Sequence, residues 1–135
     1  MALVKVFGRA IPDNESVTFT KTEVQFSVGA VKKNELERFK FIRLAYDPGR
    51  RRLYFGFEQK DHKEAISFYQ QENRTSRRMC SAAGLYSRFE FIKEVRDRAD
   101  RNQRRFDLLP VNMKDKEATP NRAGGHPNYS YYIQL

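Results

Sequence analysis

The amino-acid sequence predicts a β-rich α+β protein made of two related strand–helix–hairpin units around one core. Phe and Tyr supply much of the apolar surface, with 11 Phe, 7 Tyr and no Trp among 135 residues, and aromatic residues favour strands. Several short stretches alternate apolar and polar residues, as a strand with one buried face does. One aromatic and basic pattern also occurs twice. Together these features predict a small barrel or a sheet-based pseudo-dimer.

The repeated pattern sets the expected domain organisation. Residues 38–43 read Arg-Phe-Lys-Phe-Ile-Arg, and residues 88–93 read Arg-Phe-Glu-Phe-Ile-Lys. Each copy follows a segment of small residues and precedes a charged turn, which indicates an internal duplication. We therefore expect one domain over 1–135, with repeats over 17–58 and 65–111, a mobile loop over 112–128 and a closing strand over 129–135.

The first half of the chain predicts strands around one short helix. Strands are expected over 3–7, 17–20 and 24–26, and Ser27 is the expected N-cap of a helix over 28–37. The clearest strand covers 39–46. The turn signal at 47–50, which contains adjacent Pro and Gly, leads into a strand over 52–57. These two strands should form a hairpin with Arg50, Arg51 and Arg52 at its tip.

The second half is expected to contain a strand over 65–69, a loop over 70–78, a helix over 79–86 and a strand over 106–111. Residues 89–105 allow two interpretations. The repeat predicts a strand followed by a turn, whereas the spacing of Ile92, Val95 and Ala99 predicts a helix to about residue 102. We favour the strand for 89–94 because the repeat requires it.

The charge balance indicates a polyanionic partner. The chain has 26 Lys and Arg against 17 Asp and Glu, a net charge of +9, so nucleic acid is the first candidate and an anionic membrane surface the second. The single cysteine, Cys80, excludes an intramolecular disulfide and is expected to be a buried packing residue. No stretch approaches the roughly 18 apolar residues of a membrane span, and the N-terminus lacks the apolar core of a signal peptide. A cytoplasmic protein without membrane contact is expected.

Arginine clusters are the candidate binding residues, because guanidinium forks match phosphate oxygens. They comprise the hairpin-tip residues Arg50, Arg51 and Arg52, the loop residues Arg74, Arg77 and Arg78, and the second-turn residues Arg101, Arg104 and Arg105, beside Arg96 and Arg98. Tyr54, with Tyr69 and Tyr132, could stack on the bases of a single strand. The competing interpretation is a solvated charged face with the aromatic residues filling a core.

Two further functions stay open as alternatives. Asp13, after Pro12, and Glu58-Gln59-Lys60 spell the short signature of a Mg²⁺-dependent nuclease. A protein-interaction module, such as a phage or host-modulating factor that binds an acidic protein, would also explain the basic charge. His62 and His126 are expected at the surface, and no metal-ligand pattern is present in the sequence. We expect a non-enzymatic protein without a cofactor.

The first unit resembles the swapped-hairpin unit of the AbrB and SpoVT family of bacterial DNA-binding regulators. The resemblance rests on the order strand (23–27), helix (28–36), long strand (39–46), turn (47–51) and strand (52–57). It implies that two units interlock into one barrel, with a homodimer as an option, and that the protein regulates transcription. The basic sheet of PC4-type single-strand binders is a second resemblance. We therefore expect a nucleic-acid-binding protein of low sequence specificity, with DNA preferred to RNA.

Overall fold

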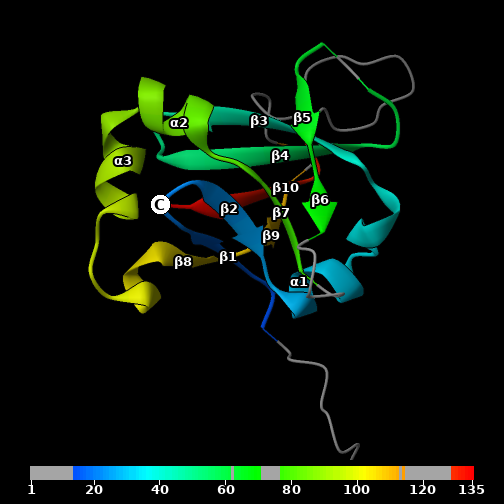
Figure 1. Cartoon of the computed structure of the whole chain (residues 1–135), viewed down its shortest axis with the longest axis horizontal. Coiled ribbons are helices and arrows are strands. Elements are labelled where there is room, and N and C mark those ends of the chain that lie inside the picture. Colours follow the sequence, from blue (N-terminus) through cyan, green and yellow to red (C-terminus); the bar gives the residue numbers. More distant parts are fainter. Residues whose placement is uncertain (1–13, 62, 71–76, 113, 115–128) are drawn as a thin grey trace, which may run out of the picture.

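The computed structural model describes residues 14–61, 63–70, 77–112, 114 and 129–135. Within these residues the strands form two five-stranded sheets, and every strand pairing is antiparallel. Short helices lie around the two sheets (Figure 1). The fold is therefore mixed α+β and rich in strands, as the sequence predicts. Both sheets are open, so the barrel form of the prediction is not confirmed.

The elements divide between the two sheets and the helical segments. Sheet A contains, in spatial order, β6 (Tyr69–Gln70), β7 (Arg78–Ser81), β2 (Glu23–Phe26), β1 (Ser16–Phe19) and β8 (Arg105–Asp107). Sheet B contains β5 (Ala65–Ser67), β3 (Phe41–Asp47), β4 (Arg52–Glu58), β10 (Tyr131–Gln134) and β9 (Leu109–Pro110). The helices are α1 (Val28–Lys33), α2 (Ala83–Arg88) and α3 (Glu90–Arg96), with short 3₁₀ turns η1 (Leu36–Arg38) and η2 (Arg101–Arg104).

The core lies between the two sheets, and aromatic rings fill much of it. Phe26 of sheet A is fully buried and meets Phe55 of sheet B edge-on, with ring centroids 5.0 Å apart. The same ring contacts Phe57 at 5.7 Å and Phe68 at 5.2 Å. Edge-on contacts are a favoured geometry for aromatic rings. Phe26 therefore joins the two sheets into one core.

Ser27 caps α1, as predicted. Its Oγ accepts hydrogen bonds from the backbone N–H of Ala30 at 3.1 Å and of Ser16 at 3.0 Å, and its hydroxyl donates to the carbonyl of Asn14 at 2.8 Å. One side chain thus starts the helix and also holds the beginning of β1. The helix ends at Lys33, earlier than expected, and η1 follows it.

The β3–β4 hairpin also confirms the prediction. Its register runs from Phe41 opposite Glu58 to Asp47 opposite Arg52. The turn includes Arg51, whose φ of 54° lies in the left-handed region. The closing strand β10 pairs with β4 and places Ile133 opposite Leu53. The hairpin and the C-terminal strand therefore form the middle of sheet B.

The predicted strand over 89–94 is wrong, because these residues form the start of α3. Ile92 and Val95 are both fully buried, and their spacing of three residues places them on one helical face. Apart from Phe91, charged residues occupy the other positions of the helix. The second half of the repeated pattern consequently lies in strand β3 in the first copy and in helix α3 in the second.

Three other expected elements also differ from the structure. The strand expected over 65–69 is divided at Phe68 between β5 of sheet B and β6 of sheet A. The helix expected over 79–86 is wrong in its first half, because Met79 and Cys80 lie in β7 and pair with Gln25 and Val24 of β2. The strand expected over 106–111 is broken at Leu108, which is buried and donates its N–H to the carbonyl of Glu15 at 2.9 Å. At Leu108 the chain leaves sheet A for sheet B. At residues 79–80 and at Leu108, contacts with distant segments of the chain determine the structure, against the preference of the local sequence.

Some predictions fall outside the described residues. They are the strand over 3–7, most of the loop over 112–128, Asp13, Arg74 and both histidines. Among the described helices, none is both long and apolar enough to cross a membrane.

Candidate anion-binding face

The outer face of sheet A carries a row of polar side chains. Val17 and Phe19 of β1 are fully buried in the core, so the alternation of the strand directs Ser16 and Thr18 to the opposite face. Gln25 of β2 lies opposite Thr18 on one side, and Arg105 of β8 lies opposite it on the other. Hydroxyl, amide and guanidinium groups are therefore placed next to one another by strand register alone.

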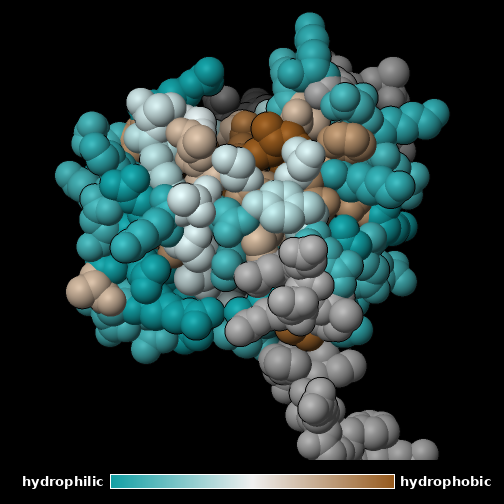
Figure 2. Space-filling view, in the orientation of Figure 1, coloured by the Kyte–Doolittle hydropathy of each residue, from teal (hydrophilic) through white to brown (hydrophobic). Residues whose placement is uncertain are grey.

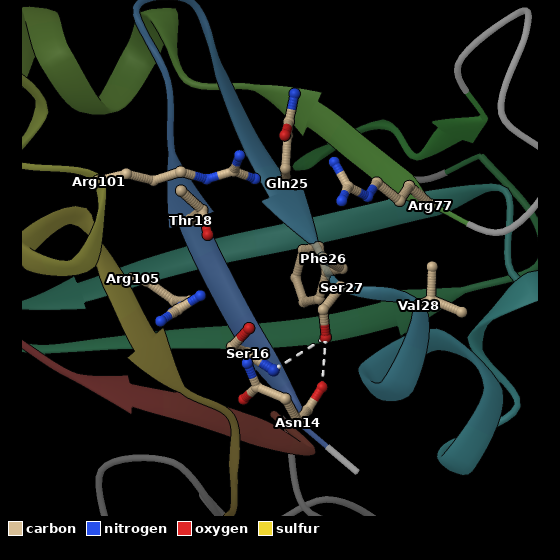
Figure 3. Close-up of a pocket in the computed structure, with 10 residues that line it drawn as sticks. All are labelled: Asn14, Ser16, Thr18, Gln25, Phe26, Ser27, Val28, Arg77, Arg101 and Arg105. Carbon is tan, nitrogen blue, oxygen red and sulfur yellow. Dashed lines mark hydrogen bonds between the residues drawn. The ribbon is translucent and has the colours of Figure 1, made fainter. Parts of the chain in front are cut away.

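A pocket of about 170 Å³ opens on this face. Its lining residues are Asn14, Ser16, Thr18, Gln25, Phe26, Ser27, Val28, Arg77, Arg101 and Arg105. Figure 3 shows Arg101 and Arg105 on one side and Arg77 on the other, with Thr18 and Gln25 between them. None of the described residues that line the pocket is acidic. We call the surface formed by these residues, which is a candidate site for anions, the anion-binding face.

The turn η2 positions two of the three arginines. Asp100 accepts a hydrogen bond from the N–H of Asn102 at 2.9 Å and thereby starts the turn. The side-chain oxygen of Asn102 then accepts a hydrogen bond from Nη2 of Arg105 at 2.7 Å. Arg101 is exposed, and no described residue accepts a hydrogen bond from its guanidinium. On the η2 side of the pocket, a hydrogen bond to Asn102 thus holds the guanidinium of Arg105, whereas the guanidinium of Arg101 has no hydrogen-bond partner among the described residues.

Only part of the predicted arginine set reaches this face. Arg104 turns inward, where its Nη1 donates to the carbonyl of Phe19 at 3.2 Å, and its Nε is buried with no hydrogen-bond partner among the described residues. Arg78 donates to the carbonyl of Glu37 at 2.9 Å. These two arginines hold chain segments together, whereas Arg77, Arg101 and Arg105 surround the pocket.

The hairpin-tip arginines are at the predicted turn, but internal contacts occupy them. Arg50 donates to Asp47 at 2.8 Å, and this hydrogen bond lowers the pKa of the Asp47 carboxyl. The guanidinium of Arg51 lies 4.0 Å from the ring centre of Phe91 in α3. Nε of Arg52 donates to Gln134 at 2.9 Å. The tip therefore fastens the hairpin to α3 and to β10.

The predicted stacking role of Tyr54 is wrong, because only 3 % of this residue is exposed. The rings of Tyr129 and Tyr132 cover it at 6.0 and 5.8 Å, and Arg50 donates to its hydroxyl at 2.9 Å. Tyr69 is exposed, and its hydroxyl donates to Glu23, which raises the pKa of Tyr69 to about 12.

Glu58 and Cys80 are engaged within the fold. Glu58 accepts a hydrogen bond from Nε of the buried Arg43 at 3.0 Å. Cys80 is fully buried, as predicted, and burial, followed by the charge of Glu23, raises its thiol pKa to about 12. The described residues contain no group of three or more His, Cys, Asp or Glu side chains able to hold a metal ion.

Sequence reasoning missed the polar residues of the pocket, Ser16, Thr18 and Gln25. Their alternation with the core residues Val17, Phe19, Val24 and Phe26 was a usable signal for a second, polar strand face, although Ser16 and Thr18 on that face are themselves buried. Their neighbours across the sheet were not readable from the sequence.

No protein-family model, curated protein or solved structure matches the chain. Function is therefore inferred from the site itself.

Proposed function

We propose that this protein binds nucleic acid with low sequence specificity and that it holds backbone phosphates at the anion-binding face. The observation that carries the proposal is the convergence of Arg77, Arg101 and Arg105 on a polar pocket without an acidic lining residue. Guanidinium groups from separate chain segments can contact successive phosphate oxygens. The net charge of +9 would draw a polyanion toward this surface.

The remaining pocket groups support contacts to the backbone rather than to base edges. The half-buried amide of Gln25 can donate hydrogen bonds to phosphate or sugar oxygens. Ser16 and Thr18 also line the pocket, but only 3 % and 7 % of these residues are exposed. Contacts to phosphate or sugar oxygens position a polymer but carry no sequence information. Low sequence specificity follows, and the protein needs no catalytic group for this role.

The biological form of the proposal is DNA binding in transcription regulation. The order β2, α1, β3, β4 is the order of elements on which the AbrB and SpoVT resemblance rests. The polar outer face of sheet A equally suits the PC4-type resemblance, which implies a single strand. A cytoplasmic location and a homodimer belong to the same proposal.

Fluorescence anisotropy with labelled 20-mers tests this function. Single- and double-stranded DNA and RNA of mixed sequence are titrated at several salt concentrations. We expect micromolar or tighter binding whose affinity falls steeply with salt, because phosphate contacts release counterions. The triple variant R77A/R101A/R105A should reduce the log–log salt slope by about 2.7 on duplex and about 2.1 on a single strand, at 0.9 and 0.7 per phosphate.

A matched control removes the same charge elsewhere. The variant K32A/K60A/K93A loses three exposed lysines that do not line the pocket. Its salt slope should change by less than about one unit, since long-range charge is screened beyond a Debye length of about 10 Å at 0.1 M salt. Equal reductions of the salt slope in both triple variants would show that binding depends on the net charge of the protein and not on the three pocket arginines. Absence of binding at low salt would reject the function and direct attention to an acidic protein partner.

A further inference from the structure

A second, larger groove lies away from the anion-binding face. It has a volume of about 620 Å³ and runs between the outer edge of β3, the start of β5 and helix α2. Its apolar walls come from Leu44, Tyr46, Ile66, Leu85 and Phe89, and the rings of Tyr46 and Phe89 meet with centroids 4.8 Å apart, so β3 and α2 are in contact at that end. Ala45, Glu64, Ser81, Gly84 and Arg88 complete the lining. Figure 2 shows apolar side chains gathered on this side of the molecule, between α2 and β5 of Figure 1. Ile66 is 37 % exposed and carries the apolar surface to the rim of the groove.

One wall of the groove is an open strand edge. Strand β3 covers seven residues, but its outer neighbour β5 pairs only with Phe41, Ile42 and Arg43. Within the described residues no strand continues along the edge past Arg43. Leu44 to Asp47 therefore form an edge with pairing on the β4 side alone.

The strand register shows which backbone groups face this edge. Leu135 donates its N–H to the carbonyl of Arg51 at 2.9 Å, so the odd-numbered residues of β4 direct their backbone groups toward β10. Even-numbered residues of β4 then face β3, where their partners are the odd-numbered residues. The even-numbered Leu44 and Tyr46 consequently direct their N–H and C=O groups away from β4. The N–H of Phe68, which donates to the carbonyl of Lys40 at 2.8 Å, follows the same alternation.

The opposite wall supplies a charge. Arg88 in the last turn of α2 is exposed and lines the groove. No described residue accepts a hydrogen bond or forms an ion pair with its guanidinium. Glu64, just before β5, also lines the groove, so the groove holds one charge of each sign. A cation is complementary to a carboxylate, and like charges repel, so a partner's carboxylate is expected on the α2 side, at Arg88 and away from Glu64.

We propose that an extended segment of another protein binds in this groove as an added strand, and that the segment carries alternating apolar residues and an acidic one. Its main chain pairs with Leu44 and Tyr46, in line with β5, because an unpaired edge is a template for strand addition. Its apolar side chains pack between β3 and α2, and its carboxylate meets Arg88. This interaction is independent of the nucleic-acid function.

Selection from a display library of random decapeptides tests the proposal. We expect the wild-type protein to enrich peptides with alternating apolar residues and an Asp or Glu. Gly84 lines the groove, and a Cβ added there meets no atom within 4 Å. The variant Gly84→Phe should therefore fold normally and bind the synthetic form of an enriched peptide at least tenfold more weakly. The matched control is Ser87→Phe, an exposed position of α2 outside the groove, which should stay within twofold of wild type.

Two further measurements identify the occupant. Arg88→Glu should reverse the preference, so that replacing the acidic residue of the peptide by Lys now improves binding at least fivefold. Amide hydrogen exchange at Leu44 and Tyr46 should slow when the peptide binds. Enrichment that Gly84→Phe does not affect would overturn the proposal. A concentration-dependent dimer that Gly84→Phe dissociates would also overturn it, since a second copy of the chain would then be the occupant. Displacement of the peptide by a DNA oligonucleotide would overturn it as well.

Discussion

Replacement of Phe26 tests whether the two sheets share one core. Its ring is fully buried and makes edge-on contacts with Phe55 at 5.0 Å, Phe68 at 5.2 Å and Phe57 at 5.7 Å. Truncation of a core Phe to Ala costs about 3–5 kcal/mol, from lost transfer free energy and the cavity that remains. Aromatic pairs add about 0.5–1.5 kcal/mol each beyond area burial. Three such contacts place Phe26→Ala at the upper end, about 4–5 kcal/mol.

Urea unfolding followed by far-ultraviolet circular dichroism measures this loss. A domain of this length has a free energy of unfolding of roughly 7–20 kcal/mol, at 0.05–0.15 kcal/mol per residue, so Phe26→Ala should fold but with a lower midpoint. Phe26→Leu keeps most of the volume and should cost about 1–2 kcal/mol. Leu109→Ala, at a position 36 % exposed, should cost less than about 1 kcal/mol.

The number of unfolding transitions gives a second check on the same reasoning. One shared core predicts a single transition in wild type and in Phe26→Ala. A loss below about 1.5 kcal/mol would mean that the surrounding rings repack without a cavity. Two separate transitions in the variant would mean that each sheet is stable alone. Either result would refute the role assigned to Phe26.

Three further predictions concern single side chains. Ser27→Ala removes the helix cap and two tethers of β1, so it should cost about 1–2 kcal/mol in urea unfolding, and Ser27→Thr should recover most of it. Burial raises the pKa of the Cys80 thiol to about 12, above its unfolded pKa of about 8.5. The unfolded state therefore loses its proton first, and the free energy of unfolding falls as pH rises between these two values. Wild type should lose more stability than Cys80→Ala between pH 8 and 10.5, and an equal loss would contradict this. Arg51→Ala removes the cation–π contact with Phe91 and should cost about 0.5–1 kcal/mol while leaving the DNA salt slope unchanged; a lower slope would place Arg51 in the binding surface.

Local signals in the sequence were sufficient for elements that neighbouring residues define. The Pro-Gly turn at 48–49 closes the β3–β4 hairpin, and Ser27 caps α1 because its side chain reaches an N–H three residues away. Both features depend on contacts over a few residues. The strand-rich α+β class follows for the same reason, because short alternating stretches are visible one at a time.

Contacts between distant segments account for the errors. Residues 79 and 80 entered a strand because β2 offered a partner, although the small residues that follow them favour a helix. At 89–94 the local spacing of Ile92 and Val95 predicted the helix, and the repeat argued against it. A helix there buries both side chains against the core. Burial of an apolar face therefore outweighed the similarity of six residues.

In the candidate site, too, the features that depend on contacts between distant segments are those that the sequence did not predict. Arg104 and Arg105 are adjacent in sequence, yet one reaches into the fold toward Phe19 and the other lines the anion-binding face. Composition cannot separate them, because the pairing of Thr18 with Arg105 joins segments far apart in the chain. Tyr54 was misassigned for a related reason. The residues that bury it, Tyr129 and Tyr132, are close to the other end of the sequence.

The net charge of +9 is consequently a poor measure of the surface that a polyanion would meet. Arg43 is buried beside Glu58, Arg78 and Arg104 bind backbone carbonyls, and Arg51 lies against Phe91. Each of these cations stabilises a contact between segments, so its removal should change the free energy of unfolding more than the salt dependence of binding. Arg101 makes no hydrogen bond within the described residues, so its removal should do the reverse. Stability and salt slope, measured on the same variants, therefore separate the structural arginines from those available to the proposed polyanion.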